Sequence, residues 1–222
     1  IILALDTNDI SKALSIVKSI DANVIFKLGM EFFYTFGYEG IEKVKSIRPN
    51  IKIFLDLKLH DIPNTVCKAV MPLVEKIKPY MMTIHSTGGR VMMQEVVKTL
   101  EEIPKNERPL LLGVTVLTSL DSKSLIELGR SADVNQNVIQ YALLSKKSGL
   151  DGIICSALEI EKVRKVCGDE FKIVTPGIRV NNNYDDQARV VTPEDAFNKG
   201  TDYIVIGRPI MNSLDPKTEL SK

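Results

Sequence analysis

Three charged residues stand close together in the stretch FLDLKLHDIPNT, which runs from Phe54 to Thr65. The apolar run that precedes them predicts a buried strand, on which residues two apart point to the same side. Asp56 and Lys58 should therefore lie side by side in the interior, with Asp61 just past the end of the strand. Because removing a charge from water is costly, interior charges are usually paired. The motif indicates either catalytic chemistry or a buried ion pair.

The composition is ordinary for a soluble globular protein, with 44% apolar and 26% charged residues among 222. The net charge of +1 gives no electrostatic reason to expect nucleic acid or an anionic membrane as the main partner. No apolar stretch approaches the roughly 20 residues that span a bilayer, and Ile1–Asp6 lacks the features of a signal peptide. Three cysteines without metal-type spacing predict ordinary thiols in a reducing, cytoplasmic setting.

Apolar, β-branched runs alternate with longer amphipathic patterns along the whole chain. The continuous runs are typical of parallel strands that are buried on both faces. The predicted strands are Ile1–Asp6, Val24–Gly29, Ile51–Leu59, Met81–His85, Leu110–Leu117, Gly152–Ser156, Lys172–Thr175 and Tyr203–Ile206. Helical patterns cover Asp9–Ser19, Thr65–Ile77, Asn137–Ser148 and Ala157–Val166, and Asp9 and Thr192 are predicted to cap helices.

Eight βα units in 222 residues predict a (β/α)8 TIM barrel, with residues 1–222 as a single domain. The competing fold, an open doubly wound sheet, usually has about five or six strands. Residues 118–136 are polar and weakly periodic, so we expect a long loop there, of the kind that often forms a functional lid.

Polar residues fall repeatedly at the carboxyl ends of the predicted strands, where TIM barrels place their active sites. One such residue alone would be better explained as part of a structural ion pair, but a collection at one end of the barrel indicates a functional site. For His60 and His85, local hydrogen bonding is a better explanation than a direct catalytic role. The residues at these ends are Asp6, Lys27, Asp56, Lys58, Asp61, His85, Thr118, Pro176, Gly177, Arg179, Gly207 and Arg208.

The segments VTPGIR and VIGRP, after the last two predicted strands, favour an anion site. Their glycines let backbone N–H groups approach a ligand closely, and Pro209 can begin a short helix there. Barrels often bind phosphate at this position, and Arg208 would add a charge-assisted contact.

The segments LALD, FKLG, FLDLKLHDIPNT, VTVLTS, VTPGIR and VIGRP resemble, in this order, the motifs of bacterial-type orotidine 5'-phosphate decarboxylases. The resemblance extends from Ile1 to about Pro216. A shorter Asp-x-Lys-x-x-Asp element occurs in a wider superfamily of sugar-phosphate lyases, whereas the extended form is more specific. The resemblance implies conversion of orotidine 5'-phosphate to uridine 5'-phosphate and CO2, the last step of de novo pyrimidine synthesis, without metal or organic cofactor.

The resemblance also implies a homodimer and a role for each matching residue. Lys58 would donate the proton to C6 of the pyrimidine, and Asp56 would lie beside the substrate carboxylate. Lys27, together with Asp61 contributed across the interface, would complete an alternating array of charges. The implied substrate-binding residues are Asp6, Lys27, Asp56, Lys58, Asp61, Ile62, Thr65, Thr118, Pro176, Arg179, Gln187, Gly207 and Arg208, with Thr65 also reaching across the interface.

Two alternatives remain open at the level of sequence. A metal-dependent lyase or aldolase that acts on a sugar phosphate would need acids at these strand ends, whereas Lys27 and Lys58 form a cationic array that repels a metal. A non-catalytic nucleotide-binding protein on a barrel scaffold would have no need for an interior Asp–Lys pair. An activity that a strong chelator does not change would exclude the metal-dependent enzyme. Loss of turnover in Lys58→Ala would exclude the non-catalytic binding protein.

Overall fold

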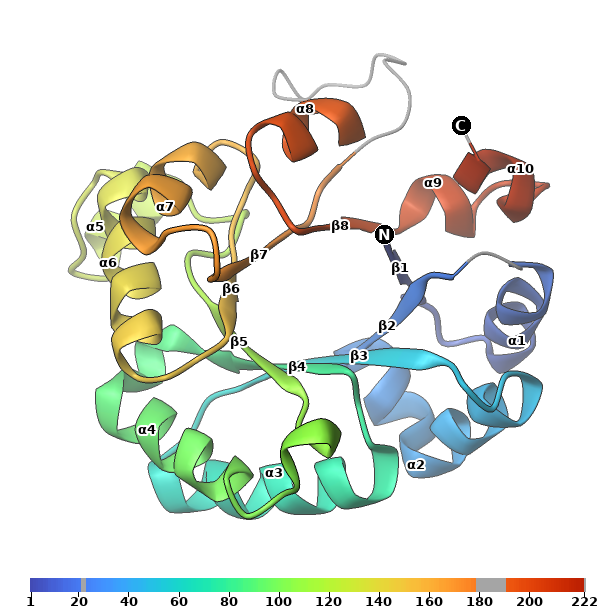
Figure 1. The fold of residues 1–222 in the computed structure, drawn as a ribbon. Helices are drawn as coiled ribbons and strands as arrows, with labels where there is room; N and C mark the ends of the chain where they lie inside the picture. The colour runs from blue at the N-terminus through green and yellow to red at the C-terminus, as the bar shows by residue number, and fades with distance from the viewer. Residues whose placement is uncertain (21–22, 179–190, 222) are drawn as a thin grey trace.

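The computed structural model describes residues 1–20, 23–178 and 191–221 as a closed barrel of parallel strands with helices around the outside (Figure 1). The strands are β1 (Ile2–Ala4), β2 (Ile25–Gly29), β3 (Lys52–Leu59), β4 (Met81–His85), β5 (Leu110–Val114), β6 (Gly152–Ile154), β7 (Lys172–Thr175) and β8 (Tyr203–Ile206). Each strand pairs with the next, and β1 pairs with β8 to close the ring. The predicted fold class is confirmed.

The helices lie between successive strands and after the last one. They are α1 (Ile10–Ser19), α2 (Met30–Ile47), α3 (Pro63–Ile77), α4 (Gly89–Leu100), α5 (Ser122–Glu127), α6 (Val134–Lys147), α7 (Ile160–Cys167), α8 (Pro193–Asn198), α9 (Arg208–Met211) and α10 (Pro216–Ser221), with short 3-10 turns at Ser86–Gly88 and Lys105–Glu107. Within the described ranges, no helix is long and apolar enough to cross a membrane.

Side-chain caps account for two helix starts that the sequence predicts. The Asp9 carboxylate accepts hydrogen bonds from the Ser11 and Lys12 N–H groups at 2.9 and 3.1 Å. Thr192 accepts one from the Asp195 N–H at 3.1 Å, directly before Pro193. Such caps satisfy N–H groups that have no partner within the helix.

The expectation of a continuous loop over residues 118–136 is wrong. Helix α5 occupies the middle of this segment, and α6 begins at Val134, three residues before the predicted start. The carboxylates of Asp121 and Asp133 accept hydrogen bonds from the N–H groups of Ser124 and Gln136, respectively, at 2.8 and 3.2 Å. Both helix starts therefore depend on local capping, which weak apolar periodicity does not indicate.

Alternate residues of each strand point into the barrel and form an apolar floor there. This inner cluster consists of Ile2, Ala4, Ile25, Phe54, Met81, Leu112, Val174 and Val205. The intervening residues, such as Leu3, Phe26 and Leu55, pack against the helices in a second, larger cluster. The next inward positions toward the carboxyl ends are Asp6, Lys27 and Asp56, so the strand period places these charges above the apolar floor.

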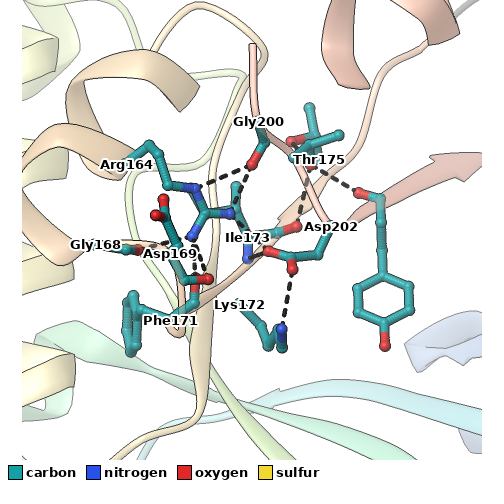
Figure 2. A network of polar contacts seen from close by, with 11 residues as sticks. Arg164, Gly168, Asp169, Phe171, Lys172, Ile173, Thr175, Gly200 and Asp202 are labelled. Carbon is teal, nitrogen blue, oxygen red and sulfur yellow. Dashed lines mark hydrogen bonds and ion pairs between the residues drawn. The ribbon is translucent and has the colours of Figure 1, made fainter. Parts of the chain in front are cut away.

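A polar network joins the segments that lead into the last two strands (Figure 2). The Arg164 guanidinium of α7 donates to the Gly200 carbonyl and forms a 2.7 Å ion pair with Asp202. It also donates to the backbone carbonyls of Gly168, Asp169 and Phe171. Burial opposes ionisation of Asp202, but hydrogen bonds from Ile173, Arg164 and Lys172 hold its pKa below the ordinary value. One side chain thus connects the segments that lead into β7 and β8.

Candidate active site

A cavity of about 710 Å³ opens at the carboxyl end of the barrel. Residues from every strand except β4, or from the loops that follow these strands, line it. Its size falls within the range typical of small-molecule sites. Eight of the substrate-binding residues that the family resemblance implies line this cavity: Asp6, Lys27, Asp56, Lys58, Thr118, Pro176, Gly207 and Arg208.

Four of the lining residues form a chain of alternating charge. Lys27 Nζ lies 2.9 Å from Asp6 Oδ1 and 3.6 Å from Asp56 Oδ2. Lys58 Nζ lies 2.9 Å from the same Asp56 oxygen. The side chains of Lys27 and Asp56 are only 10% and 11% exposed, whereas that of Lys58 is 28% exposed. Asp56 is therefore held between two ammonium groups, and Lys58 is the one more open to a ligand.

The position of Lys58 depends on an irregularity in β3. The pairing register between β3 and β4 shifts between Leu55 and Leu59, and Lys58 adopts a φ of 50°. A positive φ is uncommon for a residue other than glycine, and a bulge redirects the side chains beside it. The Lys58 N–H donates to the hydroxyl of Thr83 on β4 at 2.9 Å.

Thr83 contacts the charged chain from β4, and none of the sequence motifs includes it. Its hydroxyl also donates to Asp56 Oδ1 at 2.9 Å, so it contacts both members of the central Asp–Lys pair. The signal that could have found it is the alternation along β4. Met81 points into the barrel, so Thr83 must do the same, one step above the apolar floor.

Gly29, at the end of the FKLG segment, leaves room for the charged chain. A Cβ at this position would lie 3.1 Å from Lys27 Nζ and 3.2 Å from Asp6 Oδ1. Both distances are shorter than ordinary van der Waals contacts, so a larger residue would displace the ion pair.

His60 and His85 form a stacked pair beside this chain, with ring centroids 5.2 Å apart. The His85 Nδ1 atom lies 2.7 Å from the Thr87 hydroxyl and accepts a hydrogen bond from the Thr87 N–H at 3.3 Å. Burial, reinforced by the charges of His60 and Lys58, lowers the pKa of His85 to about 4. His85 is therefore neutral near pH 7 and makes the local hydrogen bonds that the sequence analysis predicts.

Cys155 also lines the cavity, at the end of β6. Burial, together with the nearby Glu159 carboxylate, raises the pKa of the Cys155 thiol above its ordinary value. Because a thiolate is the reactive form of cysteine, this thiol is unsuited to be a nucleophile. In the described part of the chain, no group of three or more His, Cys, Asp or Glu side chains is placed to hold a metal ion.

The opposite side of the cavity is lined by the segments that follow β7 and β8. Pro176, Gly177, Gly207 and Arg208 line it, and Gly177 has a φ of 79°, which favours glycine. Helix α9 begins at Arg208, with Pro209 in its first turn, as the VIGRP segment predicts. The Arg208 guanidinium is exposed and forms no ion pair with any described acid, so it is available to an anionic ligand.

Residues 1–222 match the family described as "Orotidine 5'-phosphate decarboxylase / HUMPS family". The chain belongs to this family. It is 46% identical over 217 residues to the orotidine 5'-phosphate decarboxylase of Wolbachia pipientis subsp. Culex pipiens (strain wPip), covering 97% of this chain and 93% of that protein. The decarboxylase of Haemophilus influenzae (strain PittEE) is 43% identical over 218 residues, covering 97% of this chain and 93% of the relative.

Solved structures of orotidine 5'-phosphate decarboxylases share the fold of this chain. The crystal structure of the Lactobacillus acidophilus enzyme superposes with a TM-score of 0.87 at 37% identity, covering 100% of this chain and 95% of that one. The Pyrococcus horikoshii OT3 enzyme shares the fold at 22% identity, with a TM-score of 0.78 and coverage of 99% and 95%. The predicted family and enzyme class are confirmed.

Some residues that the family resemblance assigns to the site do not line the cavity of this chain. Asp61, Ile62 and Thr65 are exposed and do not line it. The Asp61 carboxylate instead accepts a hydrogen bond from the Ile62 N–H at 2.7 Å. The charged chain therefore includes Asp6 and not Asp61. Two further residues, Arg179 and Gln187, lie outside the described residues.

Proposed function

We propose that this chain decarboxylates orotidine 5'-phosphate to uridine 5'-phosphate in pyrimidine synthesis, with Lys58 as the proton donor. The observation that carries the proposal is the Lys58 ammonium group, which lies 2.9 Å from Asp56 in a cavity that Arg208 also lines. Among the described residues, no acid forms an ion pair with Arg208. The cavity thus offers a cation for a reacting carbon and another for a phosphate.

The chemistry requires a cation at the reacting carbon. When the bond between C6 and the carboxylate carbon breaks, CO2 leaves and the electron pair remains on C6 as a carbanion with little resonance relief. A protonated Lys58 stabilises that charge and then transfers its proton to C6, which gives the product. The ammonium of Lys27, 3.6 Å from Asp56, offsets part of the negative charge of that carboxylate.

The Asp56 carboxylate would lie near the carboxylate of the substrate and repel it. At about 4 Å and an effective dielectric of about 20, Coulomb's law gives roughly 4 kcal/mol. This energy corresponds to about three decades in rate, far less than a very slow uncatalysed reaction requires, and the contribution of such ground-state stress is contested. We therefore assign most of the rate enhancement to the Lys58 ammonium group at C6 and to phosphate binding at Arg208.

The decisive assay follows the absorbance of orotidine 5'-phosphate with purified protein and no added metal. We expect turnover that a strong chelator does not change, which a metal-dependent lyase would not show. Lys58→Ala should lose turnover while it still binds uridine 5'-phosphate, because product binding depends mainly on the phosphate side. Absence of turnover by the intact protein would exclude the proposal.

We propose further that the active unit is a homodimer in which Asp61 and Thr65 act in the cavity of the neighbouring subunit. The support for this proposal is that Asp61 and Thr65 are exposed. Their neighbour Ile62, a large apolar residue, is 66% exposed as well. In such a dimer, Asp61 would extend the charged chain past Lys58.

Mixing two inactive variants tests this arrangement. Lys58→Ala and Asp61→Asn subunits, unfolded and refolded together, form hybrid dimers in which one site carries both changes and the other carries neither. Random pairing should restore about a quarter of the wild-type activity. If the mixture stays as inactive as its components although hybrid dimers form, Asp61 acts in its own subunit and the shared-site proposal fails.

A cytoplasmic location completes the proposal. All three cysteines, Cys67, Cys155 and Cys167, are free, as expected for a reducing compartment. Recovery of the activity in the cytosolic fraction of cells that express the chain would support this location, and recovery in an exported fraction would contradict it.

A further inference from the structure

A single buried hydroxyl on β4 contacts both central residues of the charged chain. Thr83 is 1% exposed and is not among the residues that line the cavity. Its Oγ1 atom donates to Asp56 Oδ1 at 2.9 Å and accepts from the Lys58 N–H at 2.9 Å. The hydroxyl therefore acts as donor and acceptor at once, toward two different parts of the site.

The contact with Lys58 supports an unusual backbone. The register between β3 and β4 shifts after Leu55, and Lys58 adopts the left-handed φ of 50°. At such a bulge an N–H group loses its place in the regular ladder of hydrogen bonds, and a buried N–H without a partner is strongly unfavourable. Thr83 provides the missing acceptor, so its hydroxyl stabilises the backbone conformation from which the Lys58 side chain extends.

The contact with Asp56 fixes the orientation of its carboxylate. Asp56 Oδ2 faces both Lys27 and Lys58, at 3.6 and 2.9 Å. The other oxygen, Oδ1, faces the Thr83 hydroxyl. Without that third donor the carboxylate could rotate between its two ammonium partners, and the position of the Lys58 ammonium would become less well defined.

We propose that Thr83 is a positioning residue for decarboxylation, whose hydroxyl holds the Asp56 carboxylate and the Lys58 backbone in the reactive arrangement. This inference rests on the proposed function, because it assigns the proton transfer to Lys58. Thr83 acts through these two residues and does not touch the substrate itself.

The test uses variants that separate the hydroxyl from the shape of the side chain. Thr83→Val keeps the shape and removes both hydrogen bonds, whereas Thr83→Ser keeps the hydroxyl. We expect Thr83→Val to lower kcat by about 10- to 100-fold, the effect of a lost hydrogen bond to a charged group combined with a misplaced reacting group. Its affinity for uridine 5'-phosphate should stay within about twofold, and Thr83→Ser should retain most of the activity.

Thr175→Val is the matched control. Thr175 lies on β7, is fully buried at 0% exposure, and shares a 2.9 Å hydrogen bond with the Thr201 hydroxyl. Neither threonine is among the residues that line the cavity. Loss of this hydrogen bond in Thr175→Val should lower the melting temperature without a comparable fall in kcat. A fall in kcat that occurs at position 83 and not at position 175 is a result that a merely structural role would not produce.

Two results would overturn the inference: a Thr83→Val enzyme with kcat within about twofold of wild type, or a Thr83→Ser enzyme as impaired as Thr83→Val. If Thr83→Val does not fold, Thr83→Ala replaces it with the same expected fall and the same contrary result. Lys58→Ala, measured in the same series, separates the two proposals. If Lys58→Ala keeps its turnover, the proposed function fails. If Lys58→Ala loses its turnover while Thr83→Val stays fully active, only the role of Thr83 is rejected.

Discussion

At the scale of single residues, the site depends on spacing as much as on charge. Lys27 bridges Asp6 and Asp56, and Gly29, two positions along the same strand, leaves the room that this bridge requires. The glycine of the FKLG segment therefore belongs to the site for a steric reason, although it has no side chain to contribute to the chemistry.

Replacing Gly29 with alanine should impair catalysis. The new Cβ would lie 3.1 Å from Lys27 Nζ, so the ammonium group must move by a few tenths of an ångström. We expect kcat to fall by about 10-fold or more, since small displacements of reacting groups have large effects on rate. Steady-state kinetics beside a melting curve will check this, and an unchanged kcat in a folded variant would show that the array tolerates the methyl group.

The stacked histidines predict a pH dependence of stability. His85 has a pKa of about 4 in the folded chain and about 6.5 when unfolded, so the unfolded state binds more protons between these values. Stability should therefore fall as the pH is lowered from about 6.5 to 4. Urea unfolding measures the free energy of unfolding at each pH. In His85→Asn this free energy should depend less steeply on pH in the same window, because up to about one proton fewer is taken up on unfolding. Identical pH profiles would mean that His85 does not contribute.

At the scale of elements, the two ends of the barrel have different tasks. The carboxyl ends carry the charged cavity, whereas the amino ends of β7 and β8 carry the network around Arg164 and Asp202 (Figure 2). In TIM barrels the face opposite the active site generally contributes to stability. The Arg164 side chain is only 16% exposed and reaches several carbonyl groups that a lysine could not reach together.

Arg164→Lys should thus destabilise the fold and leave the chemistry unchanged. We expect a loss of about 2 to 3 kcal/mol in the free energy of unfolding, because several charge-assisted hydrogen bonds are lost. Glu107→Gln is the control, since it breaks the exposed 3.0 Å ion pair with Lys78 and should cost less than about 1 kcal/mol. Chemical denaturation checks the two losses of stability, and steady-state kinetics check kcat. A large fall in kcat in folded Arg164→Lys would show that this network also contributes to catalysis.

At the scale of the whole molecule, closure of the barrel assembles the cavity. Ile2 pairs with Val205 and Leu3 with Ile206, which brings the first and last strands together. Asp6 and Arg208 are thereby placed on one cavity although they lie at opposite ends of the chain. We propose that residues 1–222 act as a single domain for this reason.

A ligand of the cavity should stabilise the whole fold. At about 100 times its dissociation constant, uridine 5'-phosphate should add about 2.7 kcal/mol to the free energy of unfolding, because the unfolded chain has no site for it. At the same concentration, Arg208→Ala should lose most of the rise in melting temperature, and uridine, which lacks the phosphate, should produce little. An equal rise for Arg208→Ala would show that the phosphate does not bind at Arg208.

Sequence alone predicted the eight strands, the barrel, the strand ends that carry charge and the family. Strand burial and the alternation of side chains are local properties, so the runs around Phe54 and Ile204 are enough to predict them. Tertiary structure alone decided that Asp6 pairs with Lys27, that the Thr83 hydroxyl joins Asp56 to Lys58, and that Arg164 reaches Asp202. These contacts depend on the register between strands and on closure of the ring, which bring together residues that are distant along the chain and that no local pattern relates.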